Sequence, residues 1–268
     1  MLTTTIPTNK AVLSSLLRAD FITQWRNRKS VILILLIPVI ILISWKGLAD
    51  KLGGPFVLSN CITIGLNAIG LMGYSNAIAR DRDKGIFQRL RVAPLTAWSI
   101  MASRLIVQLV MILLVTSAVF VTGYYADHIR LSAAGYAMGF AMAFVGGAVY
   151  LGLGQAIVGL IKNAETVNAV SRLIYFVFIM VGMFAELGVL DKLGTAAKWS
   201  PYGTVKNILA AGMQPEAWDK KNPFSDILSE GLQPTTIGHH NTIALLVTIG
   251  YALVFSALGI KWFKWSSK

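Results

Sequence analysis

The sequence contains few residues that could carry out covalent chemistry. Ser75 lies in GYSNA (Gly73–Ala77), one residue away from the Gly-x-Ser-x-Gly pattern of serine hydrolases. None of the three histidines falls in an apolar segment where it could act as the base for this serine. His239 and His240 are adjacent, but no third ligand type is near them, so we interpret them as loop residues. We therefore predict neither a catalytic residue nor a metal site.

The chain also lacks the features that would let it supply its own energy. No Gly-x-x-x-x-Gly-Lys-Ser/Thr motif is present, so we expect no nucleotide to bind to this chain. Ion pumps usually keep acidic groups in the middle of a span, where such groups are costly. Here the apolar segments hold little beyond Arg104 and Arg172 near one end and Glu186 near the other.

The most concentrated charge lies in AIARDRDKGIFQRLRVAPL (Ala77–Leu95), between two long apolar segments. Asp81 or Asp83 is placed to cap a short helix that begins near Lys84, because a carboxylate can accept from the free N–H groups of a first turn. Pro94 is placed to end that helix.

The short helix would carry an apolar ridge. Ile86 and Leu90 are four residues apart and share a face, with Phe87 beside them. The basic residues expected around the ridge are Arg82, Lys84, Arg89 and Arg91. Such a ridge could fit a groove on a cytosolic partner, whereas the alternative is an ordinary basic loop on the inner side of a membrane.

Polar or small residues recur at helical spacing on two apolar segments. The first stripe is Asn60, Thr63, Asn67, Gly70 and Tyr74, and the second is Asn168, Arg172, Tyr175, Gly182 and Glu186. Polar faces of spans normally point to protein or water, so these stripes predict either a transport pathway or contacts that join helices. Gly135, Gly139, Ala143 and Gly147 form a small-residue stripe, which we assign to packing within one chain rather than to a dimer interface.

The composition shows what kind of fold must position these residues. The 268 residues are 55% hydrophobic and only 13% charged, whereas a soluble domain of this size carries about a quarter charged residues. The apolar surplus must face lipid, so we predict a single all-α integral membrane domain. Cys61 is the one cysteine, so no internal disulfide can form.

We predict six transmembrane helices, because about 20 apolar residues cross a hydrocarbon layer of about 30 Å. Their approximate ranges are 28–45, 56–79, 98–125, 131–161, 167–187 and 242–263. Pro38 is expected to kink the first span, and the fourth is long enough to be tilted, broken or extended beyond the bilayer. We expect an amphipathic interfacial helix over 8–27, with Leu13, Leu16, Leu17 and Phe21 on one face; a plain cytosolic helix is the alternative.

The charge distribution predicts the orientation. If both termini are cytoplasmic, the inner segments hold 16 of the 24 basic residues and 4 of the 12 acidic ones, so the whole net charge of +12 lies inside. This topology accounts for the basic charge, and nucleic-acid binding explains it poorly. The outer connection 188–241 is expected to include a short re-entrant or interfacial helix around Val205, Ile208 and Leu209.

The charged stretch resembles the segment between the second and third spans of type-2 ABC transporter permeases. The matching residues are Asp81, Asp83, Gly85, Leu90, Arg91, Val92, Pro94 and Leu95. GLIKNAETVNAVSRL (Gly159–Leu173) is similar to the family's turn between spans four and five, and KWSPYGTVKNIL (Lys198–Leu209) is similar to its outer re-entrant region. The chain departs from the family in having Asp for Glu twice, Ile86, Gln88 and no proline in VGMFAELGV.

The resemblance implies a cytoplasmic-membrane export permease that works as a dimer with a second copy or a homologous permease. Two cytosolic ABC ATPase subunits would bind ATP and Mg²⁺, and this chain would bind no cofactor. The residues implied to couple the chain to the ATPase are Asp81, Arg82, Asp83, Lys84, Gly85, Ile86, Phe87, Arg89, Leu90 and Arg91. The implied pathway residues are Asn60, Thr63, Asn67, Tyr74, Asn168, Arg172, Tyr175 and Glu186.

The cargo expected from a mostly apolar pathway is an amphiphile such as a drug, a lipid or a hydrophobic peptide. Export of a lipid-linked polysaccharide is the main alternative. An ion-coupled secondary transporter would require dependence on an ion gradient and an inverted repeat, of which the sequence shows no clear sign. An intramembrane enzyme would require activity that depends on Ser75 or Glu186.

Overall fold

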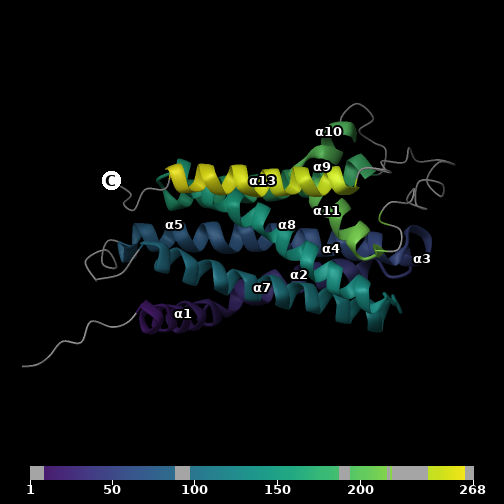
Figure 1. Cartoon of the computed structure of the whole chain (residues 1–268), viewed down its shortest axis with the longest axis horizontal. Coiled ribbons are helices and arrows are strands. Elements are labelled where there is room, and N and C mark those ends of the chain that lie inside the picture. Colours follow the sequence, from purple (N-terminus) through teal and green to yellow (C-terminus); the bar gives the residue numbers. More distant parts are fainter. Residues whose placement is uncertain (1–8, 88–96, 187–193, 216–217, 219–240, 263–268) are drawn as a thin grey trace, which may run out of the picture.

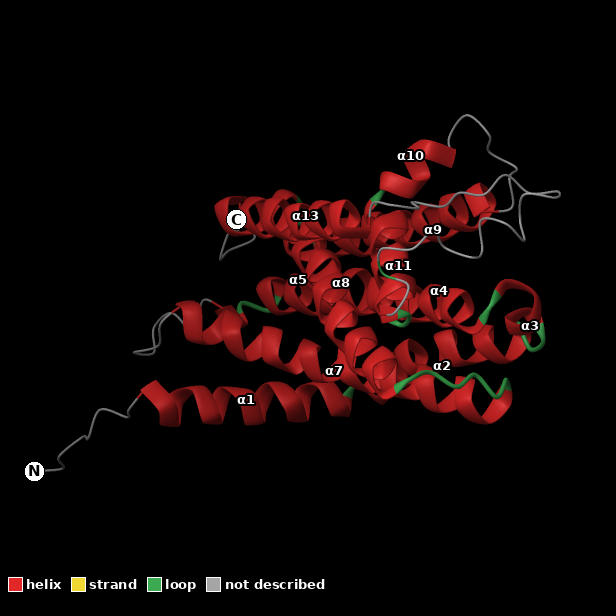
Figure 2. Cartoon of the chain, turned by 45° about the vertical axis from the view of Figure 1, so that its right-hand side comes forward, coloured by secondary structure: helices red, strands yellow, loops and turns green. Residues whose placement is uncertain are grey.

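The computed structural model describes residues 9–87, 97–186, 194–215, 218 and 241–262, and all regular structure in these ranges is helical (Figure 2). The long helices run roughly along the long axis of the molecule (Figure 1). Helices suit such an apolar chain because each segment satisfies its own backbone hydrogen bonds, which lipid cannot do.

The bounds of the elements follow the predicted spans closely. The first part of the chain forms α1 (Asn9–Arg26), α2 (Arg28–Ser44), α3 (Leu48–Leu52), α4 (Gly54–Asn67), η1 (Ala68–Tyr74) and α5 (Ser75–Asp83). The second part forms α7 (Ala97–Ala126), α8 (Ala133–Leu160), α9 (Ala164–Glu186), α10 (Gly194–Trp199), α11 (Pro201–Gly212) and α13 (Asn241–Trp262).

Five helical segments are long and apolar enough to cross a membrane by themselves. They are Gly54–Asp83, Ile100–Ala126, Ala133–Leu160, Ala164–Gly182 and Asn241–Trp262. The first predicted span corresponds to α2, whose 17 residues extend about 26 Å. It meets the same test only together with α1, to which it is bent by 61°, so the described residues hold five candidate spans, or six if this bent pair counts as one.

The second span lies at the centre of the fold. Gly54–Asp83 is one helical segment, longer than the predicted 56–79, and nearly every residue of α4 is buried. Its middle part, η1, has the wider turn of a π-helix, a form often found at functional positions. Here the main chain of Gly70 lies against the main chain of Tyr150 in α8.

The fourth span, α8, is an unbroken helix of 28 residues, which excludes the predicted break. At about 42 Å it exceeds the hydrocarbon thickness, so it must tilt or extend beyond the layer. The small-residue stripe faces other helices of the same chain: Gly139 lies against Phe120, Gly147 against Ile112, and Ala143 is fully buried. The assignment of this stripe to packing within the chain is confirmed.

The helix predicted in the outer connection is present as α11. The side chains of Val205, Ile208 and Leu209 are all fully buried, against α4, α8 and α13. Ser200 caps the helix by accepting a hydrogen bond from the backbone N–H of Gly203 at 3.1 Å. This helix is therefore an integral part of the core and not a peripheral segment.

The helix predicted before the first span is present as α1, which packs beside the N-terminal part of α7 (Figures 1 and 2). Its position in the membrane interface remains a prediction. The start of α1, the end of α5 and the end of α13 all lie at one end of the bundle, and α3 lies at the other (Figure 1). This arrangement is the one that the predicted topology requires.

Large apolar side chains are exposed around the outside of the bundle. Examples are Leu33 on α2, Leu113 on α7, Phe176 on α9 and Leu253 on α13, which are 55%, 43%, 58% and 66% exposed. A protein in water would not leave so many apolar side chains uncovered. The chain is therefore a multi-pass membrane protein.

Candidate functional site

The candidate site is built on three consecutive charged residues at the end of α5, Asp81, Arg82 and Asp83. Successive residues on an α-helix point about 100° apart, so these side chains leave the helix in different directions. Each one reaches a different neighbouring element. We call these three residues the α5 clamp.

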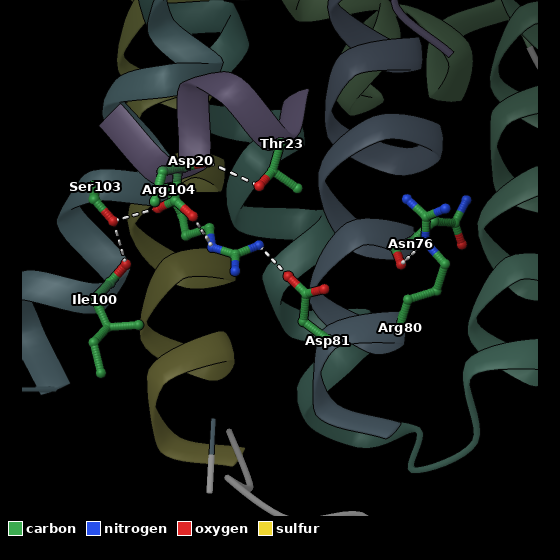
Figure 3. A network of polar contacts seen from close by, with 9 residues as sticks. Asp20, Thr23, Asn76, Arg80, Asp81, Ile100, Ser103 and Arg104 are labelled. Atoms are coloured by element: carbon green, nitrogen blue, oxygen red, sulfur yellow. Dashed lines mark hydrogen bonds and ion pairs between the residues drawn. The ribbon is translucent and has the colours of Figure 1, made fainter. Parts of the chain in front are cut away.

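Asp81 forms an ion pair with Arg104 on α7, and Arg104 also contacts α1. Arg104 Nη1 donates to the carboxylate of Asp81, and Arg104 Nε lies 3.1 Å from Asp20 Oδ1 on α1 (Figure 3). Ser103 Oγ donates to Asp20 Oδ2 at 2.5 Å. Because the three charged side chains are only 14–15% exposed, this network joins α1, α5 and α7 in a setting where water screens it weakly.

Arg82 binds the C-terminal end of α8. Its Nη1 donates to the carbonyl of Val158 at 2.7 Å, and its Nη2 donates to the carbonyls of Ile161 and Lys162 at 2.7 and 2.6 Å. The last carbonyls of a helix lack intrahelical partners and carry partial negative charge, so a guanidinium is a suitable cap. Its side chain is only 1% exposed.

Asp83 completes the clamp at the start of α9. Its Oδ2 accepts a hydrogen bond from the backbone N–H of Ala164, the first residue of that helix, at 3.2 Å. Arg82 and Asp83 therefore hold the two sides of the α8–α9 turn. The clamp fixes this turn to the end of the second span.

The expectation that Asp81 or Asp83 caps a helix beginning near Lys84 is wrong, because both lie inside α5 and their carboxylates bind other helices. The expected place of Arg82 in a basic ring around an exposed ridge is also wrong. The Arg82 side chain is buried, so its guanidinium cannot contact a cytosolic partner protein. Its hydrogen bonds go to carbonyls of its own chain instead.

After the clamp the chain turns sharply. Gly85 has φ of 67°, a left-handed conformation that glycine adopts without strain. Ile86 is half-buried, whereas Phe87 is fully buried, and its ring centroid lies 5.7 Å from the guanidinium carbon of Arg104. Of the predicted ridge, Ile86 is therefore the accessible member among the described residues, and Arg89, Leu90 and Arg91 lie outside them.

The polar side chains of the second-span stripe are buried within the chain. Asn60, Thr63 and Asn67 are 0% exposed, and Tyr74 is 2% exposed. Asn60 Nδ2 and Thr63 Oγ1 donate to carbonyls one turn earlier on α4. Both of these hydrogen bonds stay within α4, whereas the Tyr202 hydroxyl on α11 donates to Asn60 Oδ1 at 3.4 Å and so joins two helices.

The two predicted stripes meet at one point. Asn67 Nδ2 donates to the carbonyl of Tyr175 on α9 at 3.4 Å, and Tyr175 is 4% exposed. On the same helix Asn168 is half-buried and Arg172 is exposed. Glu186 ends α9, but its side chain lies outside the described part.

Ser75 is fully buried, and its hydroxyl donates to the carbonyl of Leu71 and lies 3.0 Å from Ser171 Oγ on α9. No histidine or carboxylate contacts it within the described ranges. A Ser–Ser hydrogen bond joins two helices but gives no base that could activate a nucleophile. In the same ranges no group of three histidine, cysteine or acidic residues could hold a metal ion.

Sequence reasoning missed several partners of the site. Asp20 and Ser103 join the network around Arg104, and Tyr74 donates to Gln155 Oε1 on α8 at 2.7 Å. The one signal for Asp20 was an isolated acid on a helix otherwise expected to be amphipathic and basic. Nothing in the local sequence pairs Tyr74 with a residue 81 positions away.

Asp81→Asn is expected to lower the free energy of unfolding by about 1–2 kcal/mol, because Arg104 then keeps only one of its two carboxylates in a weakly solvated position. Thermal stability of the purified protein in detergent measures this change. Combining Asp81→Asn with Asp20→Asn should lower the free energy of unfolding by more than the sum of the two single effects, since Arg104 then has neither carboxylate.

Asp50→Asn in α3 is the matched control, since this exposed carboxylate has no ion pair with any described residue. Its stability should differ from that of the unchanged protein by less than about 0.5 kcal/mol. Equal effects of Asp50→Asn and Asp81→Asn would contradict a stabilising role for the network.

The fold and the site define the class of protein: a helical multi-pass membrane protein whose second span is fixed at one end to three other helices, α7, α8 and α9. A family model described as ABC-2 type transporter matches residues 11–212, well over half of the chain. The chain therefore belongs to the ABC-2 type transporter family, as a type-2 ABC transporter permease.

The match runs from α1 to α11 and includes the α5 clamp. Proteins of this family are the membrane component of a transporter, are not themselves catalytic and work with ABC ATPase partners. Among curated proteins, none matches the sequence significantly.

Proposed function

We propose that this permease is the membrane subunit of an ATP-driven exporter that moves an amphiphilic cargo out of the cytoplasm. A separate pair of cytosolic ATPase subunits binds ATP and Mg²⁺, and this chain pairs with a second copy or with a homologous permease. The protein lies in the cytoplasmic (inner) membrane. Both termini and the end of the bundle that holds α5 face the cytoplasm. The excess of basic residues on that side supports the orientation.

The observation that carries the proposal is the α5 clamp. Asp81, Arg82 and Asp83 fix the second span to α7, to the end of α8 and to the start of α9. Phe87 lies beneath Arg104 directly after the turn at Gly85. A displacement of the segment that follows would therefore act on several spans at once.

Such an arrangement suits mechanical coupling. When the ATPase pair closes on ATP, a helix docked in it moves as a rigid body, and packed helices respond by switching between discrete arrangements. The residues proposed to contact the ATPase are Lys84, Gly85, Ile86, Arg89, Leu90 and Arg91. Asp81, Arg82, Asp83 and Phe87 support them by transmitting the displacement to the spans.

The proposed pathway runs beside α9. Leu173, Phe176 and Met180 on this helix are 63%, 58% and 44% exposed, and Arg172 is exposed next to them. An apolar face with one basic residue suits an amphiphile with an anionic or polar end. The buried residues Asn60, Thr63, Asn67 and Tyr74 would reach the cargo only in an arrangement in which α4 and α9 separate.

The proposal predicts that the segment after α5 determines assembly with the ATPase. Ile86→Asp combined with Leu90→Asp is expected to weaken co-purification of the ATPase on the order of 10–100-fold, because two carboxylates cannot be buried in an apolar groove without a large cost. Co-purification from detergent, followed by ATP-dependent transport in vesicles, measures the loss.

The matched control places two carboxylates on neutral, exposed positions of α1, by Ser14→Asp combined with Ala19→Asp, so that the net charge changes by the same amount. This variant should retain the ATPase. If the Ile86/Leu90 variant retains the ATPase and transports like the unchanged protein, the coupling assignment fails. If transport collapses with an ion gradient and ignores ATP depletion, the proposed energy source is wrong.

A further inference from the structure

A polar cavity of about 350 Å³ lies between α1, α5 and α7, at the end of the bundle where the clamp is found. Its floor is partly apolar and includes Ile78 and Val107. Its charged lining is Arg26, Arg80, Lys84, Arg104, Asp20 and Asp81. A cavity of this size, with polar and apolar walls, suits the headgroup region of an amphiphile.

The charges of the cavity do not cancel. Four basic and two acidic side chains leave an excess of two positive charges. Both carboxylates are bound to Arg104, whereas Arg26, Arg80 and Lys84 form no ion pair with any residue that the structure describes. The cavity therefore offers three cations to an anionic group.

An apolar groove of about 570 Å³ adjoins the cavity at the bend between α1 and α2. It is lined by Phe21, Ile22, Trp25, Val31 and Ile32, with Arg26 and Arg28 at its edge. Arg26 lines both the groove and the polar cavity. Phe21, Ile22 and Trp25 are 41–48% exposed, so the groove is open to the surroundings of the bundle.

We propose that these two neighbouring sites together bind one anionic phospholipid of the inner leaflet. Its phosphate lies in the cavity near Arg26, Arg80 and Lys84, and an acyl chain lies in the groove beside Trp25. Basic pockets between membrane helices on the cytoplasmic side bind anionic headgroups in this manner. The groove distinguishes a lipid from a free phosphate ester, which would use the cavity alone.

The bound lipid would bridge α1 to α5. Its phosphate would lie next to the network of Asp20, Arg104 and Asp81, which already joins α1, α5 and α7. The inference shares Lys84 with the proposed ATPase contacts and rests on the proposed orientation for its place in the inner leaflet. Its site is formed by α1, α5 and α7, and its test requires neither cargo nor ATPase.

The test uses the full chain in vesicles and lipids with brominated acyl chains, which quench tryptophan fluorescence on contact. The chain has seven tryptophans, so the signal of Trp25 is the difference between the unchanged protein and Trp25→Phe. At equal mole fractions, brominated phosphatidylglycerol should quench this signal more than brominated phosphatidylcholine. Arg26→Ala combined with Arg80→Ala should reduce the preference on the order of tenfold and leave quenching by phosphatidylcholine unchanged.

The matched control removes the same charge from the same side by Arg18→Ala combined with Lys162→Ala, whose side chains are exposed and do not line the cavity. This control should keep the preference for phosphatidylglycerol. An equal loss in both double variants would show attraction by overall charge only, and an unchanged preference in the Arg26/Arg80 variant would also overturn the proposal.

A final experiment distinguishes a phospholipid headgroup from a free phosphate ester as the occupant of the cavity. Water-soluble glycerophosphoglycerol, compared with sodium chloride at the same ionic strength, should leave the preference intact, because it cannot occupy the groove. If it abolishes the preference, the cavity binds free phosphate esters and the lipid proposal is wrong.

Discussion

Arg82→Met is expected to lower the free energy of unfolding by on the order of 3 kcal/mol, because three carbonyls at the end of α8 lose a charged donor in a buried position. A loss of this size corresponds to a fall in melting temperature of roughly 6–12 °C for a chain of this length. Thermal unfolding of the purified protein in detergent measures it. Methionine keeps most of the side-chain volume, so the effect reports the hydrogen bonds and not a cavity.

Arg80→Met is the control for this change. Arg80 lies on the same helix, but it is exposed, and among the described residues its side chain donates to the carbonyl of Asn76 one turn earlier. Its replacement should change the free energy of unfolding by less than about 0.5 kcal/mol. If the two variants have the same melting temperature, the capping of α8 by Arg82 contributes nothing to stability.

Gly70→Ala should also have a large effect, on the order of 3 kcal/mol, because an added Cβ would lie 2.5 Å from the carbonyl carbon of Tyr150. The obstacle is the main chain of α8, so no side-chain rotation can relieve the overlap. Gly154→Ala should act in the same direction, since its Cβ would lie 2.5 Å from the carbonyl oxygen of Gly70. Thermal unfolding in detergent and the yield of folded protein measure both variants.

Gly250→Ala is the matched control within a span. Beyond its own turn of helix, no described atom lies within 4 Å of the Cβ that would be added there, so the change should be neutral or stabilising by up to about 1 kcal/mol. If Gly70→Ala and Gly154→Ala are as stable as Gly250→Ala, the close crossing of η1 and α8 does not contribute to the fold.

The sequence predicted the elements well because hydropathy is a local property. A run of about 20 apolar residues has few alternatives to a helix when the solvent is lipid. The second to sixth predicted spans each have a corresponding helix. The first predicted span, 28–45, also corresponds to a helix, α2 (Arg28–Ser44), but the bend of 61° between α1 and α2 could not be predicted from the sequence.

The partners of the charged stretch could not be predicted in the same way. Arg82 binds carbonyls 76–80 residues later in the chain, and Arg104 binds one acid on α1 and another on α5. Local sequence shows that such side chains are costly in an apolar protein, but not which distant group offsets the cost. The same limit applies to the burial of Asn60 and Asn67, whose stripe looks the same whether it faces a pathway or a neighbouring helix.

By itself the sequence determined that this protein is a helical membrane permease of the type-2 ABC kind, because composition, span length and the charged motif are properties of contiguous residues. Only the tertiary structure decided that Asp81, Arg82 and Asp83 bind three different helices, and that Phe87 is buried beneath Arg104. The physical reason is that a buried charge takes the partner that helix packing brings within hydrogen-bond distance, and packing is set by the whole chain.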